Sequence, residues 1–72
     1  MIEIFKTNIK RKDSGKQVLA AIREALPGVV ATLDLVDDDK VLRVVGAWAP
    51  VSASRIIEVV KNQGFECELL ND

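Results

Sequence analysis

The hydrophobic pattern of this 72-residue chain changes its period twice, in the same way each time. Near residue 14 and again near residue 52, apolar residues stop recurring at every second position and begin to recur every three or four positions. A period of two is typical of a half-solvated strand, and a period near 3.6 of an amphipathic helix. Each helical stretch ends at a glycine, at Pro27-Gly28 and at Gly64. The chain therefore predicts two similar strand-and-helix units.

The pattern predicts four strands and two helices. The strands are expected at residues 2–9, 29–36, 41–45 and 65–70, and the helices at residues 15–26 and 53–63. In the first strand the alternation changes phase near Phe5, which indicates a bulge or a strand buried on both faces. Residues 37–40 should form the tight turn of a hairpin between the second and third strands.

Local signals set the helix ends. Ser14 and Gln17 have the spacing of a capping box at the start of the first helix. Ser52 is the expected cap of the second helix, at whose end Gly64 should be left-handed with Phe65 packing back on Val60. One core is expected between helices and sheet, made by Val18, Ile22, Leu33, Val44, Val60 and Leu69.

Right-handed crossovers put the first and third strands at the centre of the sheet, with the second and fourth strands outside. We expect the two central strands to run parallel to each other. The fold class is α+β, a ferredoxin-like βαββαβ sandwich with a four-stranded antiparallel sheet and two helices on one face. Residues 1–72 are expected to form a single domain.

Composition argues against several functions. The chain has no histidine, one cysteine and no evident nucleophile with a base, so we expect neither an enzyme nor a cofactor. A net charge of −1 and few aromatic residues argue against nucleic-acid binding. No apolar run reaches the roughly 18 residues of a membrane span, and the start lacks the order of a signal peptide. We therefore expect a cytoplasmic protein that does not enter a membrane.

Charge is unevenly distributed along the chain. Residues 1–17 carry five basic and two acidic residues, whereas residues 18–72 carry five basic and nine acidic residues. The excess of positive charge is concentrated in the turn between the first strand and the first helix. The candidate protein-binding residues of this basic turn are Lys10, Arg11, Lys12, Ser14 and Lys16.

Several segments resemble those of heavy-metal-associated domains, the copper and zinc chaperones and the N-terminal modules of metal-pumping ATPases. The resemblance rests on the segments Leu-Pro-Gly-Val at 26–29, Leu-Asp-Leu-Val at 33–36, Val-Leu-Arg-Val-Val-Gly at 41–46 and Ile-Ile-Glu-Val-Val-Lys-Asn-Gln-Gly-Phe-Glu at 56–66. Members that carry metal have Cys-x-x-Cys where the first strand meets the first helix, because two thiolates suit a soft cation. The corresponding positions here are Arg11 and Ser14, or Lys12 and Gly15, depending on the alignment. Neither alignment contains a thiol, so the resemblance implies the fold without the metal site.

The function expected from these residues is that of a protein-interaction module, a monomer or weak homodimer, whose basic turn docks on an acidic protein surface. The alternative is divergent copper or zinc binding or transport through non-standard ligands, such as Cys67 of two chains, although Cys67 falls on the inward face of its strand. Small-ligand sensing at a dimer interface is a third hypothesis, and no residue indicates it. Asp37, Asp38 and Asp39 fit a solvated turn better than a cation site. Trp48 fits a contact aromatic and an edge-packing residue equally well.

Overall fold

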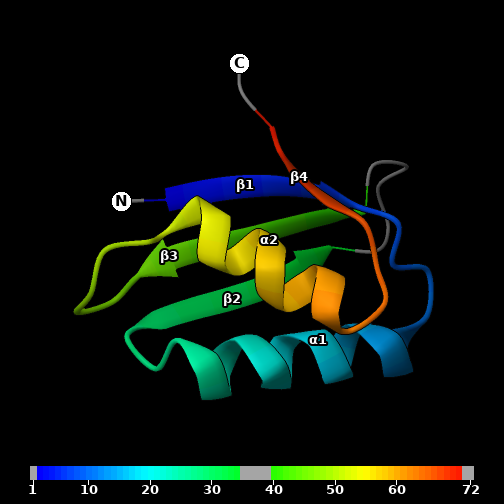
Figure 1. Cartoon of the computed structure of the whole chain (residues 1–72), viewed down its shortest axis with the longest axis horizontal. Coiled ribbons are helices and arrows are strands. Elements are labelled where there is room, and N and C mark those ends of the chain that lie inside the picture. Colours follow the sequence, from blue (N-terminus) through cyan, green and yellow to red (C-terminus); the bar gives the residue numbers. More distant parts are fainter. Residues whose placement is uncertain (1, 35–39, 71–72) are drawn as a thin grey trace.

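The computed structural model describes residues 2–34 and 40–70 of the chain (Figure 1). The elements in chain order are β1 (Ile2–Thr7), α1 (Lys12–Ala25), β2 (Val29–Asp34), β3 (Val41–Gly46), α2 (Ala53–Asn62) and β4 (Cys67–Leu69). The predicted βαββαβ order and the ferredoxin-like fold class are confirmed. Leu35 and the three aspartates at 37–39, which the sequence assigns to a strand end and a turn, lie outside the described residues.

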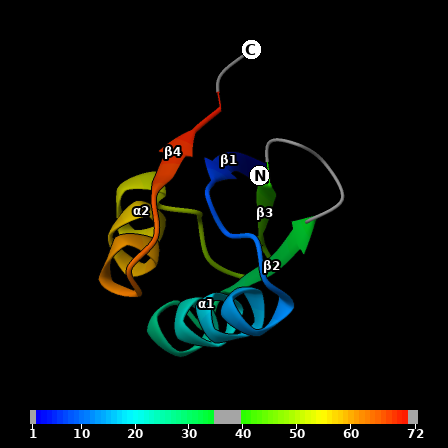
Figure 2. The same ribbon diagram turned by 90° about the vertical axis from the view of Figure 1, so that its right-hand side faces the viewer.

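The sheet has the order β2-β3-β1-β4, and every neighbouring pair of strands is antiparallel. The expectation that the two central strands run parallel is therefore wrong. A right-handed crossover makes β1 parallel to β2, which is not its neighbour, and the hairpin makes β3 antiparallel to β2. Consequently β3 must run antiparallel to β1, and both helices cover the same face of the sheet (Figures 1 and 2).

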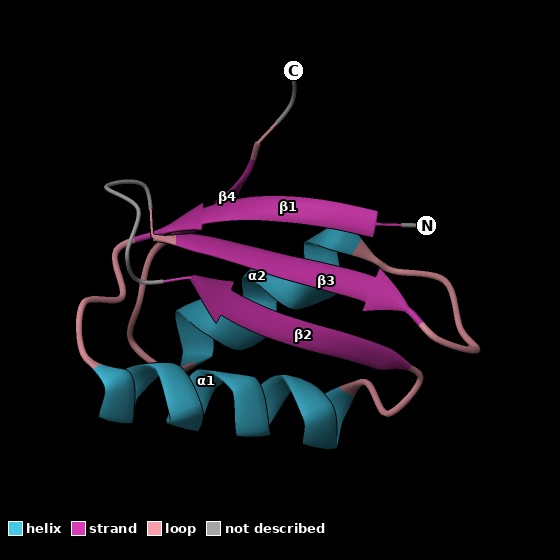
Figure 3. Ribbon diagram, turned by 180° about the vertical axis from the view of Figure 1, so that it is seen from behind, coloured by secondary structure: helices cyan, strands magenta, loops and turns pink. Residues whose placement is uncertain are grey.

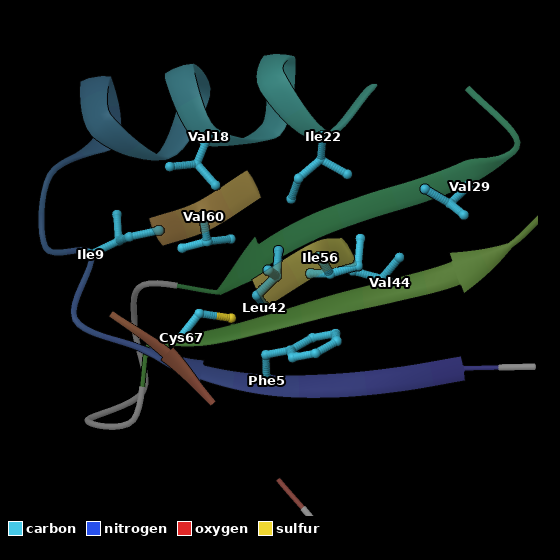
Figure 4. Packing of buried hydrophobic residues seen from close by; sticks show 10 residues of the cluster. All are labelled: Phe5, Ile9, Val18, Ile22, Val29, Leu42, Val44, Ile56, Val60 and Cys67. Atoms are coloured by element: carbon cyan, nitrogen blue, oxygen red, sulfur yellow. The ribbon is translucent and has the colours of Figure 1, made fainter. Parts of the chain in front are cut away.

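The hydrophobic core lies between this face and the two helices (Figure 4). Its buried members are Phe5, Ile9, Val18, Ile22, Val29, Leu42, Val44, Ile56, Val60 and Cys67. Four of the six predicted core residues are fully buried, while Leu33 and Leu69 are half-buried and pack against the cluster. The sequence pattern therefore assigned the inward faces correctly and underestimated how much β1 and β3 contribute.

The phase change in β1 reflects two different faces of one regular strand. The register with β3 is continuous from Ile2 opposite Val45 to Lys6 opposite Val41, so the described strand has no bulge. Phe5 is buried among the helices, whereas Ile2 lies on the open face of the sheet and is 50% exposed. The strand is thus buried on one face only, and its apolar residues on the open face are part of the solvated surface.

The helix ends follow the predicted stop signals. Gly64 is left-handed, with φ 95°, and its N–H donates to the Lys61 carbonyl at 2.9 Å while the Phe65 N–H donates to the Val60 carbonyl at 3.3 Å. This pair of bonds is a Schellman motif. Ser52 is the N-cap of α2 by position, but its side chain makes no capping hydrogen bond. Within residues 2–34 and 40–70, neither helix is both long and apolar enough to cross a membrane.

A matched pair of isoleucines tests the assignment of the faces. Ile22→Ala should lower the free energy of unfolding by about 2–4 kcal/mol, because it removes a fully buried side chain and leaves a cavity. Ile2→Ala should cost less than about 1 kcal/mol, since that side chain is half exposed. Urea denaturation followed by circular dichroism measures both. Equal losses for the two variants would contradict the described packing.

Candidate functional site

The basic turn is shorter than the sequence pattern predicts, because α1 begins at Lys12. Arg11 is the N-cap in an extended conformation, with φ −107° and ψ 144°, and the Gly15 N–H donates to the Arg11 carbonyl at 2.9 Å. Ser14 therefore lies inside the first helical turn, and no side chain caps the helix. The predicted capping box of Ser14 and Gln17 is wrong.

The early start of α1 has a packing cause. Gly15 is buried, and it precedes the buried Val18 and Ile22 by three and seven residues. These spacings put all three residues on one face of a helix, so the inward face extends one turn further than the large side chains indicate. Asp13 lies in the first turn, where a negative charge interacts favourably with the helix dipole.

Buried anchors hold the chain at the point where it leaves β1. Ile9 is fully buried in the core. Two residues earlier, the Thr7 hydroxyl donates to the Lys40 carbonyl at 2.8 Å and accepts from the Ile9 N–H at 3.3 Å. The turn therefore emerges from the sheet between an apolar anchor and a hydrogen-bonded hydroxyl that ties β1 to the start of β3.

Two pairs of polar residues connect the turn and α1 to the distant C-terminal part of the chain. The Glu66 N–H donates to Asn8 Oδ1 at 2.8 Å, and Asn8 Nδ2 donates to Glu66 Oε2 at 3.2 Å. Gln17 Nε2 donates to Gln63 Oε1 at 2.7 Å. These contacts join residues 46 to 58 positions apart in the sequence. They limit the positions that the basic turn can adopt relative to α2 and β4.

Of the five predicted site residues, the four basic ones are exposed and Ser14 is half-buried. Lys12 and Lys16 are four residues apart in α1, so they lie on the same side of the helix. Arg11 Nη2 lies 3.9 Å from Asp13 Oδ2, and both side chains are more than three-quarters exposed. Such an ion pair in solvent contributes between about 0 and 1 kcal/mol, so it leaves the turn predominantly positive.

The positions that correspond to Cys-x-x-Cys differ in their surroundings. Arg11 is exposed directly before the helix and Ser14 is half-buried one turn later, whereas Lys12 is exposed and Gly15 is buried. Neither pair supplies a soft ligand. Among the described residues, no group of three or more cysteine, aspartate or glutamate side chains is arranged to hold a metal ion.

Cys67 lines an open depression at the point where the chain leaves β1. The depression has a volume of about 470 Å³ and is lined by Lys6, Thr7, Asn8, Lys61, Glu66, Cys67 and Glu68. Cys67 is a free thiol that is only 7% exposed, which confirms the prediction that it is a core residue. Burial raises the pKa of this thiol to about 11, and the nearby Lys61 partly opposes that shift. At neutral pH the group is therefore a protonated and largely covered thiol.

Trp48 lies at the opposite end of the sheet and is 76% exposed. The N–H groups of Ala47, Trp48 and Ala49 all donate to the Gly28 carbonyl, at 3.0 to 3.3 Å, which fixes the bend that carries the indole. Most of the tryptophan side chain therefore faces solvent.

Sequence reasoning missed the polar residues that position the turn: Thr7, Asn8, Gln17 and Gln63. Asn8 directly follows a strand, which is a position where an amide side chain often bonds to backbone. That signal was available, but the partner of Asn8 is 58 residues away and emerges only from the fold.

The raised pKa of Cys67 generates a prediction about its reactivity. Iodoacetamide at pH 8 should modify the folded protein much more slowly than the urea-unfolded protein, because the thiolate is scarce and the sulfur is covered. The pKa is higher in the folded than in the unfolded state, so the protonated thiol contributes stability below pH 9 that is lost as the pH rises from 9.0 toward 11. Mass spectrometry of the iodoacetamide adduct measures the rate of modification in each state. Equal rates in the folded and unfolded states would contradict the burial of Cys67.

Comparison with solved structures identifies the fold. The structure is similar to the yeast copper transporter domain CCC2A, studied in its apo and Cu(I)-loaded states, with a TM-score of 0.80 and 26% sequence identity over 99% of this chain and 96% of that chain. It is also similar to a copper-binding domain from HMA7, a P-type ATPase, with a TM-score of 0.78 and 24% identity over 97% of this chain and 93% of that chain. No model of a known protein family matches the sequence, and no curated protein matches it either. The resemblance predicted from the sequence is thus confirmed in three dimensions, and the chain has the copper-chaperone-like fold of the heavy-metal-associated domains.

Proposed function

We propose that this domain is a non-enzymatic, cytoplasmic protein-interaction module that docks on an acidic protein surface through its basic turn. The docking residues are Lys10, Arg11, Lys12, Ser14 and Lys16. One observation supports the proposal most strongly. Four exposed basic side chains lie in the basic turn, whose backbone is held by contacts with the rest of the domain, at the position where the resemblance implies two thiolates.

The anchoring of the turn supports a docking role. Binding costs less free energy when the contact residues are already held in position, because less conformational entropy is lost. The backbone before the cations is held by the buried Ile9 and by the Asn8 bonds to Glu66, and the helix that carries Lys12 and Lys16 is held by the burial of Val18. The cations themselves remain solvated, and exposed charges of one sign accelerate the encounter with an oppositely charged surface.

The second candidate is divergent copper or zinc binding, and it is favoured by the copper domains among the structural relatives. In this chain the only thiol is Cys67, and two chains would be needed to bring two thiols together. Their pairing would require each buried sulfur to become accessible and ionised. Two lysines and two glutamates line the same depression, so its charged side chains balance and do not by themselves attract a cation.

The choice between the two candidates can be measured with metal alone. Titration with copper(I) under reducing conditions, against a competing chelator, should show no tight stoichiometric binding to the wild type. A double variant with Arg11→Cys and Ser14→Cys should gain one site, because an exposed residue before the helix and a half-buried residue one turn later can converge on one ion. Lys12→Cys with Gly15→Cys is the control and should bind more weakly, since position 15 is buried against the core. Tight binding of one equivalent by the wild type would favour the metal candidate.

The docking proposal predicts a specific effect of charge reversal. A variant with Lys10→Glu, Arg11→Glu and Lys12→Glu should associate more slowly with partners recovered from the source organism, and the rate should depend less on salt. Its melting temperature should stay close to that of the wild type, because exposed charges contribute little to stability. Biosensor association rates across a series of salt concentrations provide the measurement.

A second triple variant distinguishes the effect of the basic turn on association from the effect of net charge. Arg43→Glu, Arg55→Glu and Lys61→Glu reverse three exposed basic residues outside the turn and change the net charge equally. This control should retain association rates closer to those of the wild type. If both triple variants lose the same partners to the same extent, general electrostatics and not the basic turn explains the binding.

A further inference from the structure

The long free edge of the sheet forms a second surface, separate from the basic turn. β2 is the outermost strand on one side, with six residues, whereas β4 on the other side has three. Natural proteins usually protect such an edge with lysine, proline, a bulge or a covering segment. β2 has none of the first three, since its sequence is Val-Val-Ala-Thr-Leu-Asp and its register with β3 is regular. The edge therefore lacks these three protections, and an added strand would have to fit beside α1, which lies alongside it (Figures 1 and 3).

The hydrogen-bond pattern identifies which backbone groups of β2 face outward. The Ala47 N–H donates to the Gly28 carbonyl at 3.0 Å, which makes that pair a bonded one in the antiparallel ladder. Bonded and non-bonded pairs alternate, so Val30, Thr32 and Asp34 bond to β3 while Val29, Ala31 and Leu33 direct their backbone groups away. The Thr7 N–H donates to the Lys40 carbonyl, so every second residue from Lys40 along β3 bonds to β1. The residues between them bond to β2, which agrees with the assignment above. The Val29 N–H already donates to the Leu26 carbonyl at 3.2 Å. The free edge groups are thus those of Ala31 and Leu33 and the Val29 carbonyl.

A small cavity lies directly beside these groups, between β2 and α1. Its volume is about 200 Å³, and it is lined by Leu19, Ile22, Arg23, Val29, Val30 and Ala31. Ala31 points to the same face as Val29 and Leu33, and its short side chain leaves room under the edge. An added strand would direct alternate side chains into this cavity, which is large enough for one aliphatic side chain.

Arg23 supplies a charge at the rim of the cavity. Its side chain is exposed, and its guanidinium forms no ion pair with any residue between 2 and 34 or between 40 and 70. In the added strand, residues two positions apart direct their side chains to the same face. An acidic residue two positions from the one in the cavity would therefore lie next to Val29, on the face where Arg23 lies. Arginine binds carboxylates through paired hydrogen bonds, so this position favours an acidic side chain.

The geometry points to an extended peptide as the occupant: we propose that β2 binds a partner segment by strand addition, with an aliphatic residue in the α1–β2 cavity and a carboxylate on Arg23. A second copy of this chain fits less well. α1 lies alongside the free edge of β2 and extends beyond it (Figures 1 and 3). Antiparallel pairing of two β2 strands about a twofold axis normal to the sheet would bring both α1 helices to the same side of the sheet, where they would compete for the same space. An isolated strand brings no helix with it.

The test uses a defined probe, the capped peptide Thr-Val-Thr-Leu-Thr-Glu-Thr, added at millimolar concentration to the ¹⁵N-labelled domain. We expect amide shifts concentrated at Val29, Ala31 and Leu33. N-methylation of the central leucine should weaken binding by about tenfold, because it removes one inter-strand hydrogen bond of roughly 1 kcal/mol and adds a steric clash. Replacement of the glutamate by lysine should weaken binding to the wild type further.

Protein variants complete the experiment. Ala31→Pro removes an outward N–H without breaking a bond to β3, and should abolish the shifts. Arg23→Ala should remove the preference for glutamate over lysine, and Arg55→Ala, which changes an exposed arginine of α2, should preserve it. If Ala31→Pro does not fold, the N-methylated peptide and Arg23→Ala still decide the question. The proposal is overturned if no shifts occur, if they lie elsewhere, or if N-methylation has no effect. It is also overturned if the same amides shift with protein concentration alone, because the occupant would then be a second copy.

Discussion

The packing of both helices against one face of the sheet is the interaction on which the rest of this structure depends. Phe5 and Leu42 from the central strands meet Ile22 and Ile56 from the helices, and all four are fully buried (Figure 4). A domain of this size buries only about 60% of the surface of its unfolded chain, so one such layer must supply most of its stability. Because the helices occupy a single face, the open face of the sheet, its edges, the outer sides of the helices and the loops at the two ends remain available for recognition.

Much of this fold could be predicted from local chemistry. The inward residues of β2, the stop at Gly64 and the burial of Cys67 follow from alternation and from turn geometry, which are properties of neighbouring residues. The start of α1 could not be predicted in the same way, since Gly15 has no side chain to reveal that it belongs to the buried face. The contacts that position the basic turn escaped prediction for a different reason. Asn8 meets Glu66, and Gln17 meets Gln63, only after the second strand-and-helix unit has packed beside the first.

The candidate site combines a copper-domain fold with a turn that contains no cysteine. The structural relatives include copper domains, whereas the corresponding turn here carries lysine and arginine side chains. In the proposed account, the framework that displays two thiolates in metal-carrying members displays cations in this chain, and the turn serves recognition alone. The strand edge of β2 adds a surface of another kind, because it recognises backbone and one side chain, while the turn recognises charge. The two surfaces lie on separate parts of the molecule and can be altered independently.

Photo-crosslinking tests the central claim most directly, because it records which part of the surface touches a partner. A photoreactive phenylalanine analogue would replace Lys12 in one protein and Glu24 in another; both positions are exposed on α1, and they are separated by three helical turns. After irradiation in the cells of origin, the account predicts discrete protein adducts from position 12 and few or none from position 24. Equal adducts from the two positions, or adducts from position 24 alone, would contradict the assignment of the basic turn as the docking surface.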